Sequence, residues 1–340
     1  MDKDKKNFKA LALLSGGLDS ALAAKLILEQ GIDIIGINFT SPFCLCDQGG
    51  KCRAFEITKN LNIPFKIIFK GEDYLEIVRN PKYGYGTALN PCLDCRIYML
   101  RKSKELMKEL QADFIITGEV LGQRPMSQHR KALELIEKES GLDRKILRPL
   151  SAKLLPETEV EMRGLVNRDK LLSIKGRSRK KQFELVKKLG ITGYSTPAGG
   201  CLLTQKEFAA KLKDLFERSA KVTWHDIELL KIGRHFRAEN SKIIVGRNAH
   251  ENKLLLNLMY ENDYWFEVPN YGSPIVLLQG AKNDSAIALA ASITARYSDC
   301  KEDLVSVKYN TGKEEIEIEI KPIDEAQLQK LRIKKSDYSF

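Results

Sequence analysis

The segment Ala10–Ser20, with the sequence ALALLSGGLDS, restricts the fold of this chain more than any other stretch. Its apolar run has the length of a strand and ends in Ser-Gly-Gly, and a helical pattern of apolar residues follows from Ala21 to Leu28. A buried parallel strand that turns tightly into a helix leaves free backbone N–H groups at the helix N-terminus, where they bind anions. The segment therefore predicts an α/β fold with a phosphate-binding loop.

The side chains of this loop support the same interpretation. Gly16 and Gly17 allow the backbone to approach a phosphate, and Ser15 and Ser20 add hydroxyl donors. A carboxylate beside a phosphate is repulsive unless it holds a cation, so Asp19 indicates Mg²⁺. A bare Ser-Gly-Gly would also suit a simple glycine turn with an N-cap, but the full SGGLDS after a buried strand is more specific.

The remainder of the chain predicts three segments. Residues 1–150 alternate strands with helices, which is typical of a doubly wound parallel sheet. Residues 151–222 form a basic extension, and residues 223–340 have the mixed pattern of a separate α+β module with predicted strands at 241–245, 275–278 and 313–321. The predicted strands of the first segment are Ala10–Leu14, Ile32–Phe39, Pro64–Phe69, Asp113–Thr117 and Arg148–Leu150, and its helices after the loop include Arg53–Leu61 and Cys95–Leu110.

The composition limits the compartment and the partners. The chain has 340 residues and a formal net charge of +11, which favours a polyanionic partner. No apolar run reaches the about 20 residues of a membrane span. The start, MDKDKK, does not resemble a signal peptide, so we expect a cytoplasmic protein without a membrane partner. Seven cysteines in such a chain indicate metal, cluster or catalytic roles before disulfides.

One run within the extension is strongly basic. A charged helix face is often only solvated, but clustering within a basic protein favours contact with a nucleic-acid backbone. The candidate phosphate-contacting residues are Lys175, Arg177, Arg179, Lys180 and Lys181.

Three cysteines carry the second chemical signal. Cys92 and Cys95 lie three residues apart at the predicted start of a helix, and Cys201 follows a Gly-Gly pair. Three thiolates would hold a [4Fe–4S] cluster with one open iron for an exogenous sulfide. Alternatively, Cys201 carries a persulfide and Cys95 resolves it by forming a disulfide. Zinc would need a fourth ligand, and no histidine lies near these motifs. Incidental buried thiols are the remaining alternative.

The other cysteines are less informative. Cys44, Cys46 and Cys52 follow the second predicted strand, so they lie at the nucleotide edge of the predicted sheet. They are consistent with a metal site, with a sulfur shuttle or with an inert loop. Cys300 is expected to be structural.

These motifs together resemble a known enzyme class. SGGLDS resembles the PP-loop of the ATP pyrophosphatases, and Thr117–Gln123 with Ser127-Gln128 looks like a motif of ThiI-type tRNA 4-thiouridine synthetases. Asn90–Cys95 is similar to a motif of MnmA-type tRNA 2-thiouridylases, and Cys201 occupies the place of their sulfur-carrying cysteine. The additional Cys92 resembles the Fe–S-dependent tRNA thiolases and favours the cluster over the persulfide pair.

The resemblance implies specific roles. The ATP phosphates and Mg²⁺ would be bound by Ser15, Gly16, Gly17, Asp19 and Ser20, with Asn38, Phe39, Gly118 and Gln123 lining the same crevice. Asp19, Cys95 and Cys201 would be catalytic, and Cys92, Cys95 and Cys201 would hold the cluster. Partners would be tRNA and a sulfur donor, either sulfide or a persulfide from a desulfurase, and such enzymes often act as homodimers.

The C-terminal segment has a resemblance of its own. KIIVGRNA at 242–249, with DYWF at 263–266, resembles the RNA-binding domain of NFACT proteins. Arg247, Asn252 and Trp265 are candidate RNA contacts through phosphate, base edge or stacking. The alternative is that Trp265 belongs to the core and that Arg247 is paired internally.

The combined interpretation is a tRNA sulfurtransferase. ATP would adenylate a uridine carbonyl, and sulfur would then displace AMP, with 4-thiouridine favoured over 2-thiouridine as the product. Two alternatives stay open: a PP-loop ligase that amidates a small molecule, and an RNA-binding, nucleotide-sensing factor without thiolation.

Overall fold

The computed structural model describes residues 8–45, 52–195 and 200–338. The chain divides into two compact units, Met1–Gln205 and Lys206–Phe340. Residues 151–205 thus belong to the first unit, whereas the sequence analysis places limits at 150 and 222. A functional division into 1–150, 151–222 and 223–340 stays a prediction. Within the described ranges, no helix is both long enough and apolar enough to cross a membrane.

The first unit is built on a five-stranded parallel sheet with the strand order β3-β2-β1-β4-β5. The chain moves outward from β1 to β2 and β3 and then returns to the other side of β1 with β4. Ligands of such sheets bind at the carboxyl ends of the strands where this order reverses, here between β1 and β4. The strands are β1 Lys9–Leu13, β2 Asp33–Thr40, β3 Phe65–Phe69, β4 Phe114–Thr117 and β5 Ile146–Leu147.

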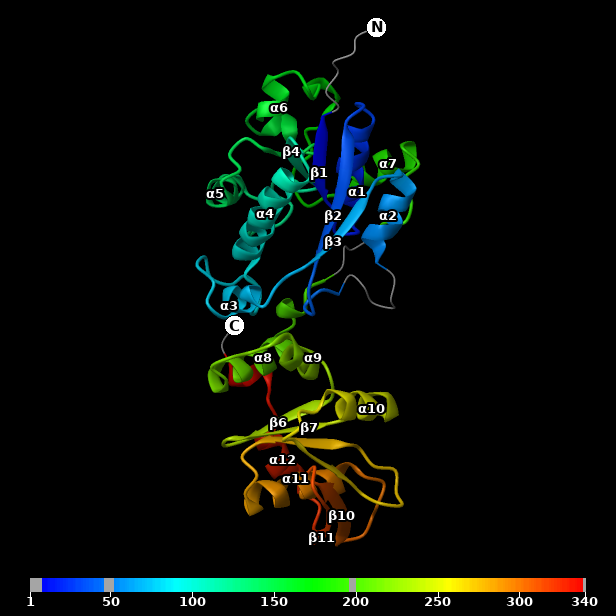
Figure 1. Cartoon of the computed structure of the whole chain (residues 1–340), viewed down its shortest axis with the longest axis vertical. Coiled ribbons are helices and arrows are strands. Elements are labelled where there is room, and N and C mark those ends of the chain that lie inside the picture. Colours follow the sequence, from blue (N-terminus) through cyan, green and yellow to red (C-terminus); the bar gives the residue numbers. More distant parts are fainter. Residues whose placement is uncertain (1–7, 46–51, 196–199, 339–340) are drawn as a thin grey trace. The chain divides into compact units, whose positions relative to one another are not determined.

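Helices cover both faces of this sheet, as Figure 1 shows. The alternation along β1 explains why: Ala10 and Ala12 pack in one core, and Leu11 and Leu13 in the other. The first core includes α1 Leu18–Leu28, α2 Arg53–Leu61, α6 Glu159–Met162 and α7 Lys180–Lys188, and the second includes α4 Cys92–Glu109 and α5 Arg130–Ser140. The unit also contains α3 Asp73–Arg79. The predicted doubly wound parallel sheet is confirmed.

Two element boundaries differ from the prediction in a way that matters for the site. Helix α4 begins at Cys92 and not at Cys95, so both cysteines lie on its first turn. Strand β5 is Ile146–Leu147, earlier than the predicted Arg148–Leu150. Pro149 has no N–H to donate to a strand ladder, and the Arg148 side chain is engaged in buried ion pairs.

The second unit is built on a six-stranded antiparallel sheet with the order β11-β10-β8-β9-β7-β6. The predicted strands at 241–245, 275–278 and 313–321 are confirmed as β7, β9 and β11. Strands β6, β8 and β10 were not predicted. The bounds are β6 Arg234–Ala238, β7 Ser241–Val245, β8 Tyr264–Glu267, β9 Val276–Gly280, β10 Val305–Asn310 and β11 Glu315–Ile320.

Apolar side chains of this sheet pack on both faces. Ile243 and Leu278 lie in a core with α11, and Ile244 and Leu277 lie in a second core with residues of α9 and α10. The helices of the unit are α8 Lys206–Arg218, α9 Trp224–Leu230, α10 Ala249–Leu258, α11 Asp284–Tyr297 and α12 Glu325–Leu331. The predicted α+β class of this module is confirmed.

Candidate active site

The glycine-rich loop connects β1 directly to α1. Gly16 has φ +74°, a conformation that favours glycine, and a Cβ atom there would lie 2.9 Å from Cβ of Arg53. The Ser20 hydroxyl donates to the Gly17 carbonyl at 2.9 Å and accepts from the Ser15 N–H at 3.3 Å. The loop is thus fixed by its own side chains around the start of α1, where the helix dipole favours an anion.

Asp19 lies on the first turn of α1 and is the acidic residue of the loop. Its Oδ2 accepts from Nε2 of Gln123 at 2.8 Å and lies 3.8 Å from Nη2 of Arg179. Its Oδ1 is buried and has no hydrogen-bond partner among the residues that the structure describes. Buried carboxylate oxygens are rarely left unsatisfied, so this atom fits a hard cation such as Mg²⁺.

Gly118 directly follows β4, and it packs against the backbone of the glycine-rich loop at Asp19 and Ser20. A Cβ atom at this position would lie 2.4 Å from the backbone nitrogen of Ser20 and 2.6 Å from the carbonyl carbon of Asp19. Backbone atoms cannot move aside as a flexible side chain can. The absence of a side chain at Gly118 is therefore what lets β4 and the first turn of α1 approach each other.

A cleft opens at this point, with about 910 Å³ of space that is partly continuous with solvent. Asn38, at the carboxyl end of β2, donates from Nδ2 to the Leu14 carbonyl at 2.7 Å, and within the described part of the chain its buried Oδ1 has no hydrogen-bond partner. The predicted nucleotide residues that line the cleft are Ser15, Gly17, Asp19, Ser20, Asn38, Phe39, Gly118 and Gln123, and Gly16 belongs to the same loop without lining it.

Beneath the cleft lies an ion network centred on Glu119, which is 2% exposed. Its Oε1 lies 3.1 Å from Nε of Arg96, and its Oε2 accepts from Nε of Arg148 at 3.0 Å. Burial alone would raise the pKa of Glu119, but the two guanidinium groups outweigh it and hold the pKa below its usual value. Arg96 also lines the cleft, so the network positions a cation beside the nucleotide site.

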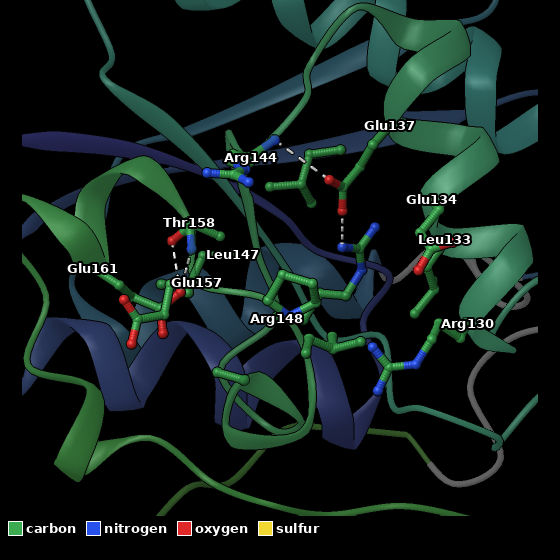
Figure 2. A pocket seen from close by; sticks show the side chains of 14 residues that line it. Arg130, Leu133, Glu134, Glu137, Arg144, Leu147, Arg148, Glu157, Thr158 and Glu161 are labelled. Atoms are coloured by element: carbon green, nitrogen blue, oxygen red, sulfur yellow. Dashed lines mark hydrogen bonds and ion pairs between the residues drawn. The ribbon is translucent and has the colours of Figure 1, made fainter.

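The far end of this network faces a second pocket of about 480 Å³, shown in Figure 2. Arg148 points toward Glu137, which it contacts through Nη1, and the backbone N–H of Arg144 donates to the same carboxylate at 3.4 Å. The predicted site residues all lie in the described ranges, and none of them lines this pocket. We therefore assign this pocket to the packing around Arg148.

A third cavity adjoins the nucleotide cleft and is lined by cysteines. It has about 850 Å³ of space, and Cys44, Cys92, Cys95 and Cys201 line it together with Lys70 and Tyr74. Among the described residues that line it, none is histidine, aspartate or glutamate. The residues shared with the nucleotide cleft are Ser15, Asn38, Phe39, Arg96, Met99 and Arg124, so the two spaces are immediate neighbours.

The thiols are partly buried, and the cationic side chains of Lys70, Arg96 and Arg124 line the same cavity. Burial raises the pKa of Cys201 to about 12, and burial together with the nearby Cys95 raises the pKa of Cys92. Lys70, at the carboxyl end of β3, is 5% exposed and donates from Nζ to Sγ of Cys95 at 3.2 Å. Burial would lower the pKa of Lys70, but attraction to the sulfur atoms of Cys95 and Cys44 raises it.

The donor set of this cavity suits a soft metal centre, because thiolates are the usual ligands of iron–sulfur clusters. Within the described ranges, no three Cys, His, Asp or Glu side chains converge closely enough to hold a metal ion. Cys92 and Cys95 come from one helical turn, and Cys201 enters from a distant part of the chain. Sequence reasoning left Cys44 undecided, and the structure adds it to this group. Cys46 lies outside the described residues, and Cys52 is the N-cap of α2.

The basic segment returns over the loop at its carboxyl side. Ser195 donates from its backbone N–H to the Gly16 carbonyl at 2.9 Å, and α7 packs beside α1. Arg179, one of the predicted RNA contacts, lines the nucleotide cleft next to Asp19. The other basic candidates, Lys175, Arg177, Lys180 and Lys181, are exposed.

The three candidates of the second unit differ in their surroundings. Arg247 is half exposed and pairs with Glu251, with Nε donating at 2.8 Å. Asn252 is engaged within the fold, because Nδ2 donates to the Ser273 carbonyl and Oδ1 accepts from the Ile275 N–H. Trp265 is half-buried, and the Lys308 ammonium lies 5.5 Å from its ring centroid. Direct RNA contact by these residues stays a prediction.

Sequence reasoning missed several residues of the site. Lys70 and Glu119 lie at or just after the carboxyl ends of strands β3 and β4, which is the signal that would have identified them. Arg96 follows Cys95 directly on α4. The direction of the Arg179 side chain depends on the path of residues 175–195 over the loop, which no local pattern encodes.

Comparisons with known proteins agree with this arrangement. Residues 6–153 match the family described as Thiamine biosynthesis protein (ThiI), and residues 233–332 match the NFACT protein RNA binding domain. The chain is 33% identical over 129 residues to a tRNA-specific 2-thiouridylase MnmA from Leptospira biflexa, covering 34% of each chain. It is 34% identical over 155 residues to a probable tRNA sulfurtransferase from Ureaplasma parvum, covering 43% of this chain and 37% of the relative.

The chain thus spans about a third of the length of the curated relatives that it matches. Among solved structures, a 4-thiouridine synthetase in complex with RNA and ATP aligns with a TM-score of 0.41 and 20% identity, over 66% of this chain and 52% of that one. The two family matches fall on separate units of the structure, one on each sheet. Residues 6–153 are therefore similar to the ThiI family, and residues 233–332 are similar to the NFACT protein RNA binding domain.

Proposed function

We propose that this protein is an ATP-dependent tRNA sulfurtransferase that converts a uridine carbonyl to a thiocarbonyl. One observation carries the proposal: the nucleotide cleft and the cysteine-lined cavity share lining residues, including Asn38 and Arg96. A carbonyl oxygen placed at their junction is within reach of both an adenylating nucleotide and a sulfur nucleophile. The ThiI-family match and the names of the relatives support the same chemistry.

In the first step, the uridine oxygen attacks the α-phosphate of ATP, and the bond to pyrophosphate breaks. The backbone N–H groups of the loop bind the phosphates at the start of α1, and Asp19 holds Mg²⁺ through its unpaired Oδ1. Arg96 and Arg179 line the cleft and stabilise the charge that develops on the leaving group. The product of this step is an adenylated uridine.

In the second step, sulfur attacks the carbon that bears the adenylate, the carbon–oxygen bond breaks, and AMP leaves. A [4Fe–4S] cluster held by Cys92, Cys95 and Cys201 would supply an iron site that binds sulfide. In the alternative, Cys201 delivers the sulfur as a persulfide, and Cys95 is the resolving thiol. The Lys70 ammonium provides a positive charge beside Cys95 for the incoming sulfur anion in either case.

Two parts of the chain would bind the RNA: exposed basic side chains of the first unit and the second unit. The exposed Lys175, Arg177, Lys180 and Lys181 lie in the same unit as the cleft and suit phosphate contacts, while the NFACT-type domain supplies further RNA affinity. The ThiI-family match favours 4-thiouridine as the product, and the sulfur donor is sulfide or a desulfurase persulfide. A cytoplasmic location and a homodimer stay predictions.

The proposal is tested by the dependence of ATP cleavage on RNA. The full chain is incubated with Mg²⁺ and radiolabelled ATP, with and without unmodified tRNA, and AMP and pyrophosphate are quantified. We expect AMP formation to require tRNA and to be abolished in Asp19→Asn. AMP formation that proceeds equally without RNA would instead support a ligase of a small molecule. No AMP under any condition would support a nucleotide-sensing factor.

A further inference from the structure

Cys44 and Cys201 are paired through their backbones. They form an antiparallel β-bridge between two loops of the first unit. The two hydrogen bonds of this bridge belong to the flanking residues: the Leu45 N–H donates to the Gly200 carbonyl at 3.0 Å, and the Leu202 N–H donates to the Phe43 carbonyl at 2.8 Å. The cysteines therefore occupy a non-hydrogen-bonded position of the bridge.

This position has a defined geometry. Residues opposite each other at a non-hydrogen-bonded position have Cα atoms about 4.5 Å apart and side chains on the same face. Disulfides span Cα separations of roughly 4.4–6.8 Å, so the pair falls at the short end of that range. Both side chains also line the same cavity.

The other candidate for a disulfide with Cys201 is Cys95, which lies on a helix and not in a backbone bridge with Cys201. Cys95 lies on the first turn of α4, and its sulfur accepts a hydrogen bond from the Lys70 ammonium. The sulfur of Cys44 has its own hydrogen-bond partner in the hydroxyl of Ser41, at 3.6 Å, but the backbone of Cys44 is paired with that of Cys201 by the bridge. Closing a bond between the two cysteines therefore requires side-chain rotation and little movement of the backbone.

We propose that Cys44 and Cys201 are a redox-reversible pair that closes to a cross-strand disulfide on thiol oxidation. One of the two, as a thiolate, displaces a thiolate from a small-molecule disulfide oxidant and forms a mixed disulfide. The other, as a thiolate, attacks the protein sulfur of that mixed disulfide and expels the second small thiolate. The protein pair loses two electrons and two protons, and the oxidant is reduced to two thiols.

The disulfide would prevent Cys201 from binding a cluster or carrying sulfur, and reduction by an external dithiol would restore its thiol. An external dithiol reduces a disulfide by thiol–disulfide exchange, so the pair can open again as a reversible device requires. The effect on sulfur transfer rests on the proposed function, but formation of the disulfide does not.

Peptide mapping tests the pairing without any activity measurement. The metal-free full chain is equilibrated with oxidised glutathione, remaining thiols are blocked with N-ethylmaleimide, and tryptic peptides are analysed by mass spectrometry. Trypsin leaves Cys44 and Cys46 in one peptide and Cys92 and Cys95 in another, while Cys201 has a peptide of its own. The matched variants are therefore Cys44→Ser and Cys46→Ser, each checked for folding by circular dichroism.

We expect the peptide that contains Cys44 to be linked to that of Cys201 in the wild type and in Cys46→Ser, and the link to disappear in Cys44→Ser and after dithiothreitol. A link that persists in Cys44→Ser, or a link from Cys201 to the Cys92–Cys95 peptide, would overturn the pairing. Where the disulfide forms, oxidation should lower thionucleoside production of the wild type relative to its own reduced form, and the same ratio of oxidised to reduced activity should stay near one in Cys44→Ser, whatever the absolute activity of that variant. An equal fall in both would overturn the inferred effect on the site.

Discussion

The buried carboxylate of Glu119 offers a quantitative test of how the site is supported. It is paired with both Arg96 and Arg148 and is almost fully buried, so Glu119→Gln leaves two guanidinium groups without their shared counter-ion. Removing one partner of a buried ion pair costs about 3–5 kcal/mol. Arg148 keeps its contact with Glu137, which places the expected loss at the lower end of that range.

The chain provides a matched control in the pair Lys66–Glu109. The atoms are 2.7 Å apart, but the side chains are 42% and 59% exposed. A pair of this kind contributes about 0–1 kcal/mol, so Glu109→Gln should change the free energy of unfolding little. Urea denaturation of the wild type and both variants measures the difference. A loss in Glu119→Gln no larger than in Glu109→Gln would refute the reasoning.

The same residue predicts a pH dependence with a definite sign. The pKa of Glu119 is lowered in the folded state, so its contribution is complete above the unfolded pKa of about 4.3. That contribution is lost as the pH falls through the lower, folded pKa. The stability difference between wild type and Glu119→Gln should therefore shrink in acid below about pH 4. A difference that stays constant from neutral pH into acid would contradict the assignment.

Three further predictions concern the nucleotide and the RNA. Gly118→Ala should cost about 1–3 kcal/mol and weaken ATP binding, because its Cβ would press on the backbone at Asp19 and Ser20. Gly31→Ala is the control, because its added Cβ would meet none of the described atoms within 4 Å. Its positive φ should make this variant less stable by about 1–2 kcal/mol, but its ATP affinity, measured by calorimetry, should be unchanged. Equal ATP affinities of the two variants would contradict the close-approach argument. Asp19→Asn should weaken binding of Mg²⁺–ATP roughly tenfold or more, with little effect on ATP without Mg²⁺, and an unchanged Mg²⁺ dependence would exclude Asp19 as the ligand. The double variant Lys180→Ala/Lys181→Ala should make the negative slope of log K against log salt for tRNA binding less steep, by about 0.7–0.9 per lysine. An unchanged slope would remove both lysines from the interface.

Much of the nucleotide site follows from local sequence. The loop SGGLDS between an apolar strand and a helix specifies its own conformation, and parallel strands bring Asn38 and Gly118 to the same edge. The sequence also predicts that a helix begins near Cys92 and Cys95, although the helix begins at Cys92, three residues earlier than expected. Short-range periodicity is sufficient for these features because each depends on its neighbours in the chain.

The rest depends on contacts between distant residues. Arg179 reaches Asp19 only because residues 175–195 return over the loop, and a charged run on a helix carries no information about that path. Cys44 joins the thiol group through a backbone bridge to Cys201, and nothing near Cys44 in the sequence predicts that register. Strand β6 has the sequence RHFRA, which is short and largely polar and gives no clear strand pattern. Strands β8, YWFE, and β10, VSVKYN, do carry a strand signal, in aromatic residues and in alternation of apolar and polar residues, and they could have been predicted.

The central claim is that a uridine of tRNA acquires sulfur at this site. The most direct measurement is nucleoside mass spectrometry of unmodified tRNA after anaerobic incubation with the full chain, ATP, Mg²⁺ and sulfide, with and without reconstitution with iron and sulfide. Cys201→Ala is the test variant, and Cys300→Ala, a buried cysteine of the second unit, is the control. The account predicts a thiouridine peak that requires ATP, survives in Cys300→Ala and is lost in Cys201→Ala. Absence of any thionucleoside with either preparation, or a peak of equal size in Cys201→Ala, would contradict it.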